Sequence, residues 1–195
     1  MIRALIVAVS ISLLGCSTRE TGTDISLEEK LRKAQDYYKK DRYSKALELV
    51  EELSRNSVGA VALEAELLKA KIYLKQEKFQ ECAQVFEALA RKYPLEPRRR
   101  EWLFQAASCL VSSRKRSEAD LTPAERAKDL LVEIKKTFGQ LSDEEKRLWR
   151  SILDQIRQFF SSIIEYYNSQ GNLRSADFYK ELLKKYLDSL NGVND

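Results

Sequence analysis

The most reactive side chains in this sequence are its three cysteines, because histidine is absent. Histidine titrates near neutral pH, so most acid–base, triad and zinc chemistry is missing with it. The sequence also contains no glycine-rich phosphate loop and no CxxC pair. An enzyme would have to use a clustered carboxylate pair or a reactive thiol, which the sequence does not display. We therefore expect no catalytic residue, no metal ion and no organic cofactor.

The first cysteine, Cys16, follows an apolar segment at the start of the chain. Arg3 supplies a short positive region, and residues 4–14 form an apolar stretch. At about 1.5 Å per residue, this stretch cannot cross a hydrocarbon layer of about 30 Å. The segment therefore predicts a cleaved export signal over residues 1–15, and not a lasting transmembrane helix.

The end of that segment, Leu13-Leu14-Gly15-Cys16, resembles a bacterial lipobox. The resemblance implies that Cys16 becomes the first mature residue and carries N-acyl and diacylglycerol lipid. Acyl chains anchor a protein durably, since each buried methylene contributes about 0.8 kcal/mol. Ser17 in place of an aspartate implies sorting to the periplasmic face of the outer membrane, with residues 16–26 as a lipidated polar tether. An ordinary signal peptide with a chance cysteine is the alternative.

The other two cysteines, Cys82 and Cys109, allow two interpretations. An oxidising compartment would permit a disulfide between them. Both also occupy helix positions that take small or buried residues, and a free cysteine packs as a small hydrophobe. We favour core packing without a disulfide.

The elements that carry these residues follow from a repeat of 36 residues. Each unit predicts two amphipathic helices around a tight turn, with small residues where the helices approach. One pair cannot bury its apolar face alone, so the units must stack into a solenoid. The matched positions are Ala34 with Ala70, Tyr37 with Tyr73, Tyr43 with Phe79, Ala46 with Cys82, Val50 with Phe86 and Leu53 with Leu89.

The predicted fold class is all-α, a superhelical solenoid of about four to five such pairs. Helices are expected at about 27–40, 44–55, 60–77, 80–93 and 97–113, and the repeats divide into residues 27–113 and 114–195. The third unit is expanded, with Pro123 in the first turn of its second helix and Thr122 as the N-cap. A long helix capped by "SDEE" starts near Asp143, and Gly171-Asn172 ends it before a last, incomplete unit.

This pattern resembles the tetratricopeptide repeat. The order of segments resembles the BamD family of β-barrel assembly lipoproteins: a lipobox, two regular repeats, "ARKYP" at Ala90–Pro94, an expanded third unit and "YYNSQGNLRSADFYKELLKKYLDS" from Tyr166. The resemblance implies a non-catalytic, periplasm-facing scaffold whose N-terminal repeats bind unfolded outer-membrane protein peptides. It also implies that the C-terminal repeats dock the barrel-forming subunit BamA, alongside other assembly-complex lipoproteins.

Docking on the last unit is expected at four neighbouring positions, Arg174, Phe178, Tyr179 and Lys180. The last unit departs from the family, because Leu187 follows Tyr186 where the family has proline and the chain stops at Asp195 before further family helices. These departures leave an alternative open. The chain could be another tetratricopeptide-repeat envelope lipoprotein, an adaptor for cell-wall enzymes or secretin assembly.

Peptide binding is expected on the concave face, which the first helix of each unit lines. Lysines beside apolar side chains could hold an extended peptide and its C-terminal carboxylate. The candidates are Gln35, Tyr38 and Lys39 in the first unit and Lys71, Leu74 and Lys75 in the second. Ordinary solvated helix surface is the alternative.

The charge balance argues against nucleic acid as a partner. There are 34 basic and 30 acidic residues, for a net charge of +4, too small for binding that relies on the electric field alone. The run "EPRRRE" at Glu96–Glu101 could meet an acidic partner or lipid head groups. We favour a solvated helix start there.

Overall fold

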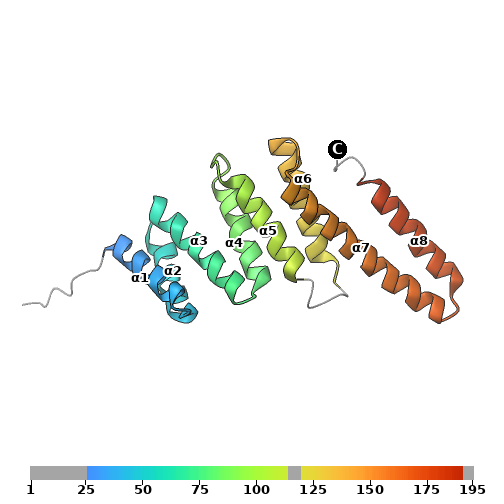
Figure 1. Cartoon of the computed structure of the whole chain (residues 1–195), viewed down its shortest axis with the longest axis horizontal. Helices are drawn as coiled ribbons and strands as arrows, with labels where there is room; N and C mark the ends of the chain where they lie inside the picture. Colours follow the sequence, from blue (N-terminus) through green and yellow to red (C-terminus); the bar gives the residue numbers. More distant parts are fainter. Residues whose placement is uncertain (1–25, 114–119, 191–195) are drawn as a thin grey trace, which may run out of the picture.

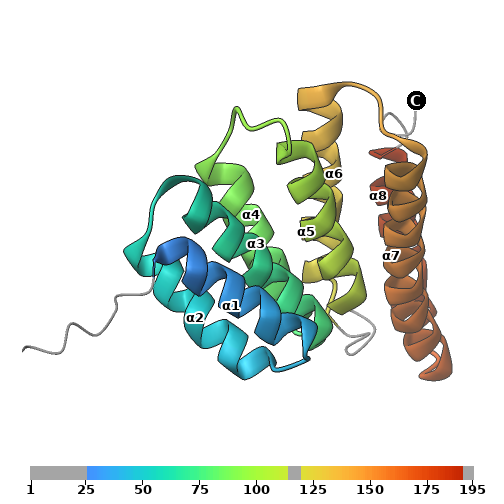
Figure 2. The same cartoon turned by 60° about the vertical axis from the view of Figure 1, so that its left-hand side comes forward.

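The computed structural model describes residues 26–113 and 120–190. Within these ranges the chain forms eight helices and no strand. The helices are α1 (Leu27–Lys39), α2 (Tyr43–Asn56), α3 (Gly59–Lys75), α4 (Phe79–Lys92), α5 (Arg99–Ser113), α6 (Thr122–Phe138), α7 (Asp143–Ser169) and α8 (Leu173–Asp188). They stack as four antiparallel pairs into an elongated solenoid (Figures 1 and 2). The all-α solenoid is confirmed, and the five predicted spans agree with α1–α5 to within two residues.

The tight turns inside three units share one backbone conformation. Asp41, Glu77 and Gly171 occupy equivalent positions and have φ angles of 55°, 56° and 72°. This left-handed residue lets the following backbone N–H bond back onto the preceding helix. Arg42 N donates to Tyr37 O at 2.9 Å, and the matching bonds in the other two turns have the same length. The chain therefore reverses directly into the second helix of each pair.

Two hydrophobic clusters meet in α3. Ala65, Leu68 and Ile72 pack with α1 and α2, while Leu67 and Ala70 belong to a larger cluster that runs through α7 and contacts α8. An internal solenoid helix must be apolar on more than one side, because a neighbour covers each side. The larger cluster passes from α5 to α6 and so crosses the boundary expected at residues 113–114 without a break.

The start of α6 differs from the prediction. Thr122 is the first residue of the helix, and Oδ1 of Asp120 accepts its backbone N–H at 2.9 Å. The prediction of Thr122 as the N-cap was wrong, because Leu121 holds that position: its carbonyl accepts the first helical bond, from Glu125 N at 3.1 Å. The capped start of α7 is confirmed, since Ser142 and Glu145 form a reciprocal capping box.

A disulfide joins Cys82 of α4 to Cys109 of α5, with the Cα atoms 6.1 Å apart. Both side chains are buried, so the prediction of core positions is confirmed, while the prediction that no disulfide forms was wrong. Burial could not separate the two alternatives, because free and bonded cysteines occupy the same kind of site. The bond connects the second unit to the third.

Candidate peptide-binding groove

A groove of about 320 Å³ lies between α3 and α5. From α3 it is lined by Glu64, Leu67, Lys71 and Leu74, whose spacing of three and four residues puts them on one helix face. The opposite wall and the base consist of Arg98, Glu101, Trp102 and Gln105, at and just before α5, with Phe86 of α4.

The base of the groove is apolar and its rim is charged. Trp102, Phe86 and Leu67 are 1%, 6% and 8% exposed, whereas Leu74 is 41% exposed. Lys71 is exposed above them. An apolar slot with a few polar groups at its edge is the usual arrangement of a ligand site.

Arg98 connects the two walls at one end of the groove. Its guanidinium donates to Glu64 of α3 at 3.3 Å and to Glu96 at 3.2 Å, and it lies 5.6 Å from the centre of the Trp102 ring. The hydrogen bonds from Arg98 to Glu96 and Glu64 raise the pKa of the guanidinium. At this end of the groove the guanidinium thus lies over an aromatic face, with its charge paired to two carboxylates.

The six groove residues predicted from the sequence separate into two groups. Lys71 and Leu74 line the groove. Tyr38 instead packs beside Tyr43, with ring centres 5.9 Å apart, in the cluster formed by the first unit. Gln35 is half-buried, while Lys39 and Lys75 are exposed, and none of these three lines the groove. Peptide binding by any of the six stays a prediction.

Sequence reasoning missed the α5 wall of the groove. The 36-residue shift carries Lys71 to Ala107 and Leu74 to Leu110, which are buried at 0% exposure. The wall comes from the opposite side of α5, which faces back toward α3. The signal that could have found it is the cluster of Arg98, Glu101 and Trp102 at the start of a first helix.

The arginines of the "EPRRRE" run are neither a solvated helix start nor an open basic patch. Each one is bound to another part of the chain: Arg98 to α3, Arg99 to Glu133 of α6 and the Ala90 carbonyl, and Arg100 to the start of α7. Both interpretations of this run are therefore corrected. The run ties the third unit to its neighbours.

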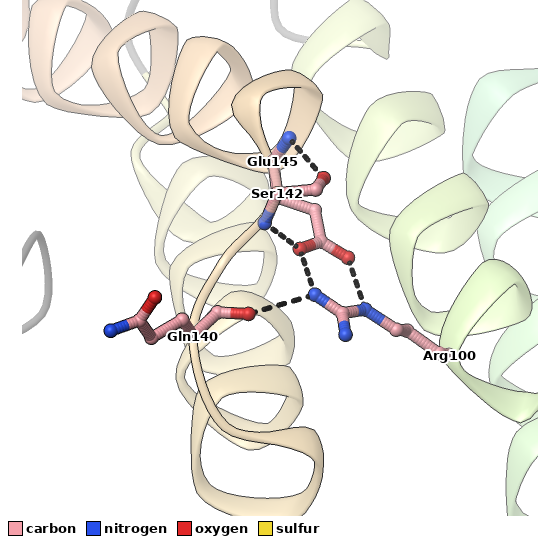
Figure 3. A network of polar contacts seen from close by, with 4 residues as sticks. All are labelled: Arg100, Gln140, Ser142 and Glu145. Carbon is pink, nitrogen blue, oxygen red and sulfur yellow. Dashed lines mark hydrogen bonds and ion pairs between the residues drawn. The ribbon is translucent and has the colours of Figure 1, made fainter.

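The Arg100 contact is the most enclosed of these ties. Nε and Nη2 of Arg100 donate to the two carboxylate oxygens of Glu145 at 2.9 and 2.7 Å, and Nη2 also donates to the Gln140 carbonyl at 2.9 Å (Figure 3). Glu145 is 4% exposed. Burial alone would raise the pKa of Glu145, but hydrogen bonds from Arg100 and Ser142 outweigh it and hold the pKa below its usual 4.5.

The four predicted docking residues all lie on α8. Arg174 is exposed, Phe178 is 61% exposed, and Lys180 pairs with Asp177 at 2.8 Å. Tyr179 is half-buried and stacks on Tyr167 of α7, with ring centres 5.5 Å apart. Docking by these side chains stays a prediction.

Cys16, the predicted lipidation site, lies outside the described residues, as do the rest of the predicted signal and all but Ser26 of the tether. Among residues 26–113 and 120–190, no helix combines the length and apolar composition needed to span a membrane. The same ranges contain no group of three or more acidic or cysteine side chains arranged to hold a metal ion.

A family model described as the tetratricopeptide repeat matches the chain twice, at residues 31–97 and 67–130. Together the matches span just over half of the 195 residues. The chain therefore belongs to the tetratricopeptide-repeat family, whose stacked units form protein-interaction surfaces. No curated protein matches the chain.

Proposed function

We propose that this protein is a non-catalytic lipoprotein scaffold of the β-barrel outer-membrane-protein assembly complex, facing the periplasm. The observation that carries the proposal is the α3–α5 groove, an apolar slot with a charged rim on an interaction fold. The narrower identification rests on the resemblance to the BamD family in the lipobox, the segment order and the closing sequence.

In this proposal the groove binds extended peptides of unfolded outer-membrane proteins. Leu67 and Trp102 supply an apolar base for one side chain of the peptide, and Lys71 supplies a cation for a carboxylate. Because the peptide is already extended and the groove is formed by two rigid helices, little ordering is needed on the protein side. The C-terminal repeats bind a BamA-like subunit through the α8 side chains.

The proposed location is the periplasmic face of the outer membrane, with Cys16 as the lipid anchor. The disulfide between Cys82 and Cys109 supports this location, because such bonds persist in the oxidising periplasm and are rare in the cytosol. The lipobox-like Leu13–Cys16 supports acylation as the means of attachment.

The proposal is tested by affinity purification of the tagged full chain from detergent-solubilised envelopes. We expect a BamA-like barrel subunit to co-purify, and depletion of the protein to lower the level of outer-membrane barrels. Recovery of cell-wall enzymes or secretin subunits instead would establish the alternative adaptor function. In the same cells, Cys16→Ala should move the protein from the outer-membrane fraction to the soluble periplasm.

The groove is tested separately with a labelled peptide copied from a strand of an outer-membrane barrel. We expect Lys71→Ala to weaken binding by up to about fivefold, because an ion pair at an exposed lysine contributes up to about 1 kcal/mol. Lys75→Ala is the matched control, since Lys75 is an exposed lysine on the same helix that does not line the groove. Equal losses of affinity in the two variants would show that the peptide does not bind in the groove.

A further inference from the structure

A second hollow, of about 430 Å³, lies along the C-terminal half of α7. We call its lining the α7 face: Phe159, Ser162, Ile163, Tyr166 and Tyr167 of α7, with Tyr179 of α8. Tyr166 is 60% exposed, although Tyr167 and Tyr179 beside it stack with only 13° between their rings. The α7 face is thus a preformed, largely aromatic surface that is half-buried at four of its six residues and exposed at Ser162 and Tyr166.

The repeat shows that this aromatic composition is not required by the position. The turn residues Asp41 and Gly171 are equivalent, so a shift of 130 residues relates α1 to the end of α7. Under this shift Phe159, Ser162, Ile163 and Tyr166 correspond to Glu29, Arg32, Lys33 and Asp36, which line a similar open hollow on α1. At α1 the equivalent solvent-facing positions are therefore occupied by charged residues and not by aromatic ones.

The α7 face continues an interface that the chain already uses for helix packing. Trp149, Ile152, Ile156 and Phe160 form a buried stripe on α7 within the cluster shared with α5 and α6. Ile163 and Tyr167 extend the same stripe, since they follow Ile156 and Phe160 by seven residues. The N-terminal half of the stripe is covered by α5 and α6, whereas the C-terminal half has the same apolar character and is packed by α8 on one side only.

The helix lengths explain why the cover ends. α7 has 27 residues, whereas α5 and α6 have 15 and 17, so α7 exceeds α6 by about 15 Å at 1.5 Å per residue. Figure 1 shows α7 diverging from α5 and α6 toward its C-terminal end. The uncovered length corresponds to about ten residues, or three helical turns.

The chemistry of the lining restricts the occupant. None of the six side chains of the α7 face is charged, and the polar groups among them are the Ser162 hydroxyl and the tyrosine hydroxyls. A charged ligand would find no opposite charge there, so binding must come from apolar burial with neutral hydrogen bonds at the edge.

We propose that the α7 face binds an amphipathic α-helix of a partner protein. The helix has about three turns, apolar residues at i, i+3, i+4 and i+7, and uncharged polar residues beside them. This inference deepens the proposed scaffold function and rests on it, because it assigns the chemistry of one partner of the C-terminal repeats. Phe178 of α8 does not line the hollow, but its ring contacts that of Tyr179, with ring centres 5.4 Å apart.

The test uses the purified full chain and a fluorescein-labelled peptide of about 14 residues, with leucine at the i, i+3, i+4, i+7 positions and serine, glutamine and alanine elsewhere. We expect saturable binding by fluorescence anisotropy that changes less than about twofold between low and high salt, because no charge pair forms. A peptide of the same composition with the leucines scrambled around the helix should not bind. Equal binding of the two peptides overturns the proposal.

Two substitutions locate the binding. Tyr166→Arg places a charge in the α7 face and should weaken binding more than tenfold, while Leu95→Arg, at an exposed apolar residue of the α4–α5 connection, should change binding less than twofold. Circular dichroism confirms that both variants fold. Similar losses in both variants, or a dimer by light scattering that Tyr166→Arg abolishes, would overturn the proposal, the latter in favour of a second copy as occupant.

The same variants separate this inference from the proposed function. If no barrel subunit co-purifies with the wild-type chain while the peptide still binds as described, the proposed function fails and the site stands. If the barrel subunit co-purifies but neither peptide distinguishes Tyr166→Arg from the wild type, the site fails and the function stands.

Discussion

The first helices of neighbouring units meet in two different ways in this solenoid. α1 and α3 contact each other directly, and Leu31 and Tyr38 of α1 share a cluster with Ala65 of α3. One unit further, α3 and α5 leave the groove of about 320 Å³ between them. The two junctions are related by the 36-residue repeat, so their difference comes from side chains and not from topology.

The side chains responsible stand at equivalent positions. Ala62 and Ala65, 4% and 0% exposed, let α1 approach α3 closely. The 36-residue shift replaces them by Arg98, just before α5, and by Glu101 on α5. Charged groups of this size cannot be buried between two helices without a large desolvation cost. In this solenoid, a groove therefore opens between two first helices where large charged residues replace the alanines of the closed junction.

The largest effect is expected when the closed α1–α3 junction receives the glutamate that the open α3–α5 junction has at the equivalent position. Ala65→Glu places a carboxylate at a fully buried position against α1 and should lower the free energy of unfolding by about 4 kcal/mol. Urea unfolding followed by circular dichroism measures this loss. The reverse change, Glu101→Ala at the exposed equivalent position, should cost less than about 1 kcal/mol. Comparable losses in both variants would contradict the explanation.

The next largest effect should come from the disulfide that holds the second and third units together beside the open groove. Cys82→Ala with Cys109→Ala should lower the free energy of unfolding by about 3–4 kcal/mol, since the cross-link closes a loop of 27 residues in the unfolded chain. Guanidinium titrations with and without a reductant provide the measurement. Cys16→Ala, which leaves the cross-link intact, is the control and should unfold like the wild type. A reductant that leaves the wild-type midpoint unchanged would speak against the bond.

A third junction, between α5 and α7, should respond to pH. The folded pKa of Glu145 lies below its usual 4.5, so its contribution is present above about pH 4.5 and is lost as the pH falls through the lower folded value. Glu145→Gln should cost about 2 kcal/mol at pH 7, because Arg100 is left without its carboxylate. Melting temperatures from pH 7 to pH 3 should fall less in the variant. Parallel pH curves would show that another group controls the acid response.

The smallest expected effect compares the turns of the units. Glu77 adopts a left-handed φ of 56° that Gly171 adopts at the equivalent turn, and a side chain costs about 1 kcal/mol there. Glu77→Gly should therefore raise the free energy of unfolding by about 0.5 kcal/mol after the entropy of glycine is included. Gly171→Ala should lower it by about 1 kcal/mol. Changes of the same sign in the two variants would contradict the shared turn geometry.

The sequence predicted the features that are determined within a single repeat unit. Ala34 and Ala46, the helix spans and the Ser142 cap follow from local patterns, and all agree with the structure. The α5 wall of the groove did not follow, because it depends on how far two units stand apart. Arg99 and Arg100 were expected to be solvated for the same reason. Their acceptors lie 34 and 45 residues away along the chain, in other units.

The cross-link between α4 and α5 also determines how the molecule responds to a cut backbone. The connection between these helices contains Leu95, which is 95% exposed, directly after Pro94 and two residues before Pro97. Cys82 and Cys109 lie on either side of this connection and are covalently joined. A protease that nicks the connection therefore leaves both fragments in one molecule, which separates on a gel only after reduction. After such a cut, the two halves of the solenoid stay joined until the bond is reduced.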